Sequence, residues 1–268
     1  MSSLRIGLSK TGMTVLRVSP WRRPRVSLVQ EADFAAPIAS AQQFREALQG
    51  VATGIDARSQ QGSIVLADEW VHYFSVASPV NVSRLADCKA IAALRFQRLY
   101  DLDATEWQIE AAWSASHHFL ACAVPRWLIE ALDEWATARR LRIAGIVPQF
   151  VCAWNQWHAR VAPDGWFGLV HADRITFSAL QARRPVEADT LLIPADALGD
   201  VSWLAQQLQR NALMHARPAP TRLYLAGGAQ QASVTSAPGS VEVVPLDLPA
   251  LPAIAPSQRI TLAMQGGR

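Results

Sequence analysis

Apolar and polar positions alternate in two segments of the chain that share one pattern. Residues 4–29 and residues 165–186 each begin with an alternating run, pass through a short polar turn into a second run, and end in a basic turn. Alternation over such short lengths predicts half-buried β-strands, and two runs joined by a polar turn predict a β-hairpin. A third strand is predicted at residues 221–228, which end in Gly227 and Gly228. The chain therefore contains the same predicted hairpin twice.

Helical spacing of apolar residues accounts for much of the remaining sequence. The predicted helices cover residues 39–48, 81–100, 126–140, 149–160 and 200–215. Further strands are predicted within residues 62–76, 106–124, 141–147 and 240–244. Asp68 and Glu69 fall between two of these strands, and we expect them to be solvated turn carboxylates. Strands that alternate with helices, with hairpins opening each half, predict an α/β (α+β) class with mixed sheets.

Prolines distinguish the last part of the chain from the rest. Residues 246–268 carry Pro249, Pro252 and Pro256. Proline lacks a backbone N–H and interrupts regular elements, so this proline-rich C-terminal tail is predicted to be extended or loosely packed.

Composition fits a folded domain with no nucleic-acid groove. The chain has 268 residues, half of them apolar, and a formal net charge of +3. Lys10 and Lys89 are its only lysines, so 23 of its 25 basic residues are arginines. The basic runs at residues 21–25 and 139–142 are short and far apart, whereas a nucleic-acid groove needs clustered basic residues interleaved with aromatic ones. We therefore expect no nucleic-acid partner.

The sequence also lacks signals for export or membrane insertion. Its start has no apolar run after a basic segment, and no apolar run approaches the roughly 18 residues that a spanning helix needs. The three cysteines are widely spaced and form no CxxC pair, as suits a reducing compartment. We expect a cytoplasmic protein that associates with a membrane only indirectly.

The order of the elements resembles that of actin-like assembly proteins in type IV pilus and type II secretion machines. These are the pilus inner-membrane platform protein M and the cytoplasmic domain of secretion protein L. The likeness covers about residues 4–245 and is carried by the two hairpins, by the strand–helix order of residues 64–160, and by the strand TRLYLAGG. It implies an actin-like ATPase fold with two ribonuclease-H-like lobes, at residues 1–161 and 162–245, and an inserted small subdomain at about 64–160.

The resemblance also implies two phosphate loops, and both are degenerate here. Members that bind ATP usually show an Asp-x-Gly pattern at each hairpin turn, because phosphate needs close backbone N–H groups and Mg²⁺ needs carboxylates. Ser9 and Thr11 occupy those places in the first turn, with Gly12 one place late. His171 and Asp173 occupy them in the second turn. No catalytic residue or metal ligand set is predicted.

Three features keep nucleotide binding open as an alternative. Asp173 is a displaced metal ligand if the alignment is shifted, and Lys10 is otherwise an exposed turn residue. Gly227 and Gly228 would admit a purine or ribose close to the backbone, although such a pair more often marks a simple turn. If a nucleotide binds at all, the predicted contacts are Lys10, Thr11, Gly12, Asp173, Gly227 and Gly228.

The sequence thus favours a scaffold over an ATPase. The resemblance implies a non-catalytic subunit of an inner-membrane assembly platform that binds the short cytoplasmic tail or domain of a membrane protein, with a homodimer as a further expectation. No cofactor is expected in this role. The alternative is an ATP-binding and weakly hydrolysing subunit of the same machinery, with ATP and Mg²⁺ as cofactors. A small-molecule kinase is a third class, for which the sequence offers no recognisable catalytic aspartate.

Overall fold

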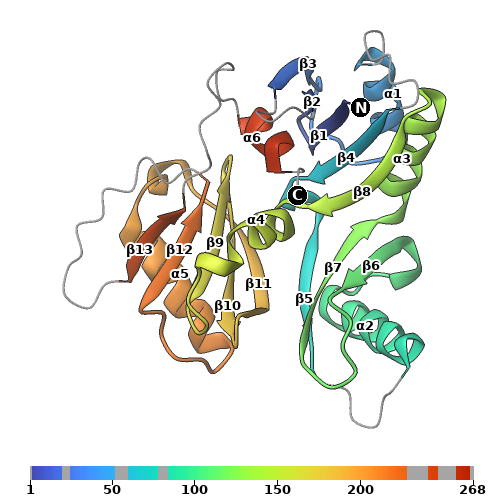
Figure 1. Cartoon of the computed structure of the whole chain (residues 1–268). Helices are drawn as coiled ribbons and strands as arrows, with labels where there is room; N and C mark the ends of the chain where they lie inside the picture. Colours follow the sequence, from blue (N-terminus) through green and yellow to red (C-terminus); the bar gives the residue numbers. More distant parts are fainter. Residues whose placement is uncertain are drawn as a thin grey trace.

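The computed structural model describes residues 2–19, 25–51, 60–77, 84–227, 241–246 and 258–265. Two lobes lie side by side, and a smaller subdomain extends from the first of them (Figure 1). The chain passes from the first lobe into the small subdomain, returns to the first lobe, and then builds the second lobe. This alternation of helices and strands, with mixed sheets in both lobes, confirms the predicted α/β (α+β) class.

A five-stranded mixed sheet forms the centre of the first lobe, in the order β3-β2-β1-β4-β8. β1, β2 and β3 are antiparallel neighbours, while β4 and β8 run parallel to β1. The strands are β1 (Ser3–Ser9), β2 (Gly12–Ser19), β3 (Arg25–Asp33), β4 (Gln61–Leu66) and β8 (Arg142–Pro148). Apolar side chains such as Ile6, Leu8 and Ile64 are fully buried in it. The first predicted hairpin therefore supplies three adjacent strands of this sheet.

The second lobe repeats this arrangement with the second hairpin. Its sheet has the order β11-β10-β9-β12-β13, with β9, β10 and β11 antiparallel and β12 and β13 parallel to β9. The strands are β9 (Trp166–His171), β10 (Arg174–Gln181), β11 (Arg184–Leu192), β12 (Arg222–Ala226) and β13 (Glu242–Leu246). The connection from β11 to β12 passes through the short 3₁₀ helix η5 (Ala195–Ala197) and the helix α5 (Val201–Met214). The two lobes therefore share one topology.

The inserted subdomain is a three-stranded antiparallel sheet with one helix. Its strands, in the order β5-β7-β6, are β5 (His72–Val76), β6 (Trp107–Ala111) and β7 (Phe119–Pro125), and its helix is α2 (Leu85–Tyr100). Phe74, Phe96 and Phe119 form a separate apolar core between them. The range expected for the insertion, 64–160, also contains β4 and β8, which belong to the central sheet of the first lobe.

Four further helices and three 3₁₀ turns complete the part of the chain that the structure describes. They are α1 (Ala41–Val51), α3 (Arg126–Ala138), α4 (Gln149–Trp157), α6 (Gln258–Gln265), η2 (Asp68–Trp70), η3 (Ala104–Glu106) and η4 (His158–Arg160). α1 and α3 pack together, and Arg45 and Glu134 form an exposed ion pair of 2.9 Å between them. No helix of the described residues is both long enough and apolar enough to cross a bilayer.

The predicted C-terminal tail is wrong for residues 258–265. α6 packs against β1, β2 and β4 of the first lobe, and Ile260, Leu262 and Ala263 are buried there. The Arg5 guanidinium donates a hydrogen bond of 3.1 Å to the Met264 carbonyl. The prolines that predicted a loose tail all precede this helix. Its own eight residues contain no proline and can therefore form a short amphipathic helix. α6 thus returns from the second lobe to cover the first sheet (Figure 1).

The second lobe also contacts the inserted subdomain directly. β11 lies beside β5, and the Val186 carbonyl accepts a hydrogen bond from the Ser75 hydroxyl. The same carbonyl lies 3.1 Å from Nε2 of His118 on the loop before β7. These contacts join the second lobe to the inserted subdomain.

Candidate functional site

The strongest candidate site is a cleft between the two lobes. It has a volume of about 1100 Å³ and is lined by residues of the β1–β2 turn, the β9–β10 turn, η2 and the loop after β11. Both degenerate hairpin turns therefore face the same space. The predicted contact residues Thr11 and Asp173 line this cleft, while Lys10 and Gly12 do not.

The first turn is closed on itself by its own hydroxyl groups. Oγ of Ser9 lies 3.2 Å from Oγ1 of Thr11 and donates a hydrogen bond of 3.1 Å to the Gly12 carbonyl. The Lys10 ammonium lies 5.3 Å from the centre of the Trp70 ring, a cation–π distance. Ser9 and Lys10 are thus committed to contacts within the first lobe, and Gly12 serves as the first residue of β2.

The second turn places an uncharged ring where a carboxylate was expected. Burial lowers the pKa of His171 from 6.5 to about 4, and the nearby Asp173 carboxylate opposes this only in part. The ring is therefore neutral at neutral pH. Asp173 is exposed and lies 3.8 Å from Nε of Arg174. Ala172 takes a left-handed backbone conformation, with φ of 55°, that turns the chain between them.

Asp68 is a site residue that the sequence analysis assigned wrongly. It follows β4 in η2, is buried, and accepts hydrogen bonds from the Tyr73 hydroxyl at 2.7 Å and from the Phe150 N–H at 3.0 Å. Burial raises its pKa from 3.8 to about 6, although these bonds and one with Thr176 of the second lobe counteract the rise. The carboxyl ends of β1 and β4 meet at one sheet edge, where α/β proteins commonly place functional side chains. That adjacency is the signal by which the sequence could have revealed Asp68.

Glu69 connects the two hairpin turns and is likewise not a solvated carboxylate. One of its carboxylate oxygens accepts a hydrogen bond from the Lys10 N–H, and the other lies 3.9 Å from Nε of Arg174 in the second turn. Its side chain is 17% exposed. An N–H group in a turn of this kind is the donor that a phosphate oxygen would use. In this chain a carboxylate of the protein itself takes that donor.

Gly227 has an architectural role that explains why it is glycine. Its φ is +71°, and a Cβ built there would lie 2.2 Å from the Val170 carbonyl oxygen. Only glycine lets the end of β12 approach the end of β9 this closely. Gly228 lies outside the described residues.

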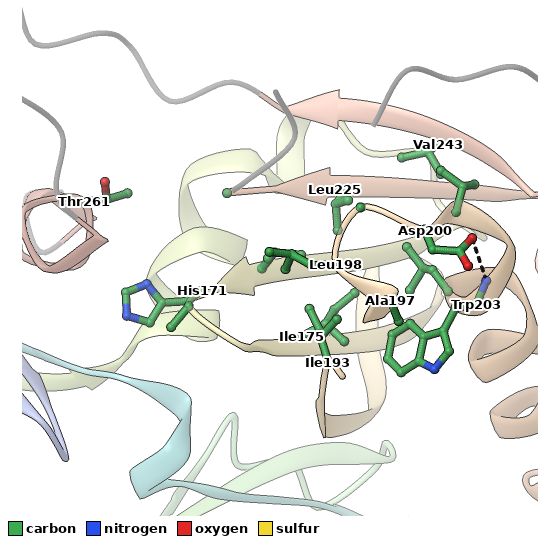
Figure 2. A pocket seen from close by; sticks show the side chains of 16 residues that line it. His171, Ile175, Ile193, Ala197, Leu198, Asp200, Trp203, Leu225, Val243 and Thr261 are labelled. Atoms are coloured by element: carbon green, nitrogen blue, oxygen red, sulfur yellow. Dashed lines mark hydrogen bonds between the residues drawn. The ribbon is translucent and has the colours of Figure 1, made fainter. Parts of the chain in front are cut away.

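A second, smaller cavity of about 330 Å³ lies beside Gly227 in the second lobe. Figure 2 shows Ile175, Ile193, Leu198 and Trp203 among the side chains around it. At its edge, Asp200 accepts hydrogen bonds from the N–H groups of Ser202 and Trp203, at 2.7 and 3.2 Å. The first N–H groups of α5 are thus already capped by a carboxylate.

The donor set of the cleft does not fit a magnesium nucleotide. His171 is a poor ligand for a cation that prefers oxygen, and Asp68 is held by hydrogen bonds from Tyr73 and Phe150. Among the described residues, no group of three or more His, Cys, Asp and Glu side chains is placed to hold a metal ion. The chemistry of this cleft is that of a negatively charged groove.

Comparison with known proteins finds solved structures that are similar to this chain, but no similar sequence family or curated protein. No protein-family model matches the sequence, and no curated protein does. The cytoplasmic domain of EpsL, an inner membrane component of the type II secretion system of Vibrio cholerae, superposes with a TM-score of 0.60 at 12% identity, over 99% of this chain and 94% of that one.

Two further solved structures resemble the chain over most of its length. A Bacteroides thetaiotaomicron protein with an actin-like ATPase fold and unknown function has a TM-score of 0.58 and 10% identity, covering 91% of this chain and 90% of that one. A chain of the PilM–PilN type IV pilus biogenesis complex has a TM-score of 0.55 and 14% identity, covering 86% and 83%. The repeated sheet topology and these superpositions together establish that the chain has the actin-like ATPase fold.

Proposed function

We propose that this chain is a non-catalytic actin-like scaffold subunit of a pilus-type or type II secretion-type assembly platform at the inner membrane. In this role it lies in the cytoplasm and binds the cytoplasmic tail or domain of a membrane protein. The observation that carries the proposal is the position of Glu69, whose carboxylate takes the Lys10 N–H and faces Arg174. A fixed negative charge between the two turns repels the phosphates that an ATPase of this fold must hold there.

The structural neighbours supply the context of the proposal. EpsL is an inner membrane component of a secretion system, and PilM stands in a complex with PilN. Both are under 15% identical to this chain, so their partners are transferred here as a hypothesis. Direct contact with a membrane is not part of it, because the partner supplies the anchor. A homodimer is compatible with the same role.

An ATP-binding and weakly hydrolysing subunit of the same machinery is the second candidate. The observation in its favour is the cavity of about 330 Å³ beside Gly227, which is large enough for a planar ring. Two of the other predicted contacts, Lys10 and Asp173, face Trp70 and Arg174 instead. The contacts that these cleft residues make therefore favour the scaffold role over the ATPase role.

Binding to a membrane partner tests the proposed function. The cytoplasmic segments of single-span membrane proteins encoded next to this chain are synthesised and titrated into the purified full chain by calorimetry. We expect one of them to bind with a Kd of about 10 μM or tighter, corresponding to about −7 kcal/mol. If none of these segments binds at concentrations tenfold higher, the assignment to an assembly platform is wrong.

A further inference from the structure

The charged groups that line the cleft between the lobes are mainly negative, although the whole chain has a positive net charge. The whole chain has a formal net charge of +3, yet three carboxylates face the cleft around the two hairpin turns and η2: those of Asp68, Glu69 and Asp173. Arg174 is the only arginine or lysine among the described residues that line it. Its guanidinium already faces two of the carboxylates, at 3.8 and 3.9 Å. The cleft therefore attracts cations and repels anions.

One wall of the same cleft is apolar and exposed. The loop that follows β11 presents Leu192 and Leu198, whose side chains are among the most exposed large apolar ones of the described residues, at 56% and 55%. Ile193 and Pro194 lie between them along this wall. Exposed leucines at the mouth of a cavity are typical of a surface that another apolar group covers.

The smaller cavity lies directly behind this wall. Ile193 and Leu198 line both cavities, as do His171 and Ala172. Figure 2 shows Ile193, Leu198 and His171 around the smaller one. An apolar side chain that passes Leu198 would enter a space of about 330 Å³ lined mainly by aliphatic groups and Trp203. A ligand that fits both spaces therefore has an apolar group next to positively charged ones.

The occupant that meets these demands is a basic peptide with apolar residues. Segments of inner-membrane proteins that lie in the cytoplasm near a membrane span are enriched in lysine and arginine, because the positive-inside rule sets their orientation. We propose that the cleft between the lobes, with Asp173 and Glu69 on its charged side and Leu198 on its apolar side, binds such a basic and apolar segment of a membrane partner. This inference rests on the proposed scaffold function and assigns its docking surface.

A synthetic peptide in which arginine alternates with leucine tests the inference on the purified full chain. Its fluorescent form is titrated by anisotropy, and a twin with glutamate in place of arginine serves as the charge control. We expect the arginine peptide to bind with a Kd of about 100 μM or tighter. We also expect this binding to weaken as salt rises from about 50 to 500 mM, because screening shortens the range of the attraction. The glutamate peptide should not bind.

Two variants place the binding in the cleft, and each has a matched control. Asp173→Asn removes an exposed charge of the cleft, while Asp196→Asn removes an exposed charge that lines neither cavity. Leu198→Ser removes an apolar contact of both cavities, while Leu213→Ser alters a side chain that is 81% exposed and lines neither. We expect each cleft variant to lower the affinity about fivefold to tenfold, and each control variant to bind as the wild type does.

The possible outcomes separate this inference from the proposed function. If the arginine peptide does not bind, or binds all four variants equally, the cleft is not the docking surface. A natural partner segment that binds wild type and both cleft variants with one affinity would overturn the inference and leave the scaffold function standing. If the cleft variants instead abolish a concentration-dependent dimer in sedimentation, the occupant is a second copy of this chain and the inference is wrong.

Discussion

At the scale of single residues, the site differs from a nucleotide site in what its carboxylates do. Asp68 accepts hydrogen bonds from Tyr73 and Phe150, and Glu69 accepts one from the N–H of Lys10. Each of these groups joins parts of the protein to one another. A carboxylate with such partners is not free to turn toward a metal ion, which favours the proposed scaffold role over the ATPase alternative.

Asp68 and His171 give the cleft a testable pH dependence. Burial raises the pKa of Asp68 from 3.8 to about 6 and lowers that of His171 from 6.5 to about 4. A group whose pKa is raised by folding stabilises the native state at low pH and loses this effect as pH rises through about 6. His171 acts in the opposite sense, because its contribution is lost as pH falls through about 4.

Single substitutions separate these two opposing contributions. Asp68→Asn removes the contribution of Asp68 and keeps that of His171, so its free energy of unfolding should fall more steeply than that of the wild type as pH is lowered from 6.5 to 4. His171→Asn removes the contribution of His171 and keeps that of Asp68, so its free energy of unfolding should rise relative to that of the wild type as pH is lowered over the same range. The difference between the two variants should change by several kcal/mol, since each pKa unit is worth about 1.4 kcal/mol. Urea unfolding at both pH values measures it, and parallel pH profiles would contradict the assignment.

The positions of some site residues could be predicted from the sequence, whereas the burial of Asp68 could not. Ser9, Thr11 and Asp173 follow strands whose alternation is plain, so their place at the turns could be predicted. The environment of Asp68 includes Phe150 at the start of α4, which donates a hydrogen bond to it and lies 82 positions away in the sequence. Local polarity could not reveal that, and it favoured a solvated turn instead.

At the scale of elements, strands and long helices were predictable, while the short C-terminal helix was not. The alternation in β1, β2, β9 and β10 and the helical spacing in α2, α3 and α5 are properties of the local sequence. α6 has only eight residues, too few to be a stable helix alone. Its stability comes from the sheet it covers, where Leu262 contacts Val65 and Ala67.

Removing this contact should destabilise the first lobe. Leu262 is fully buried, so Leu262→Ala should lower the free energy of unfolding by about 2–5 kcal/mol through lost apolar burial and a residual cavity. Leu213→Ala, at a side chain that is 81% exposed, should change it by less than about 0.5 kcal/mol. Chemical denaturation of both variants provides the measurement. Equal stability of the two would mean that α6 does not belong to the folded core.

At the scale of the whole molecule, several contacts join the second lobe to the first lobe and its inserted subdomain. Glu69 of the first lobe faces Arg174 of the second, and the Val186 carbonyl of the second lobe accepts a hydrogen bond from the Ser75 hydroxyl of the inserted subdomain. α6 adds a further connection, since it follows the second lobe in sequence and packs on the first sheet. An actin-like fold fixed in this way suits a subunit whose surfaces bind other proteins.

Calorimetric titration of ATP with Mg²⁺ into the purified full chain tests the central claim most directly. The carboxylates that face the cleft predict no heat of binding and no Mg²⁺-dependent rise in Tm at about 5 mM nucleotide, a concentration at which a ligand with a Kd of 50 μM would stabilise the native state by about 2.7 kcal/mol. A saturable, Mg²⁺-dependent heat with a Kd in the micromolar range would show that the cleft still holds nucleotide, and the scaffold account would then be wrong.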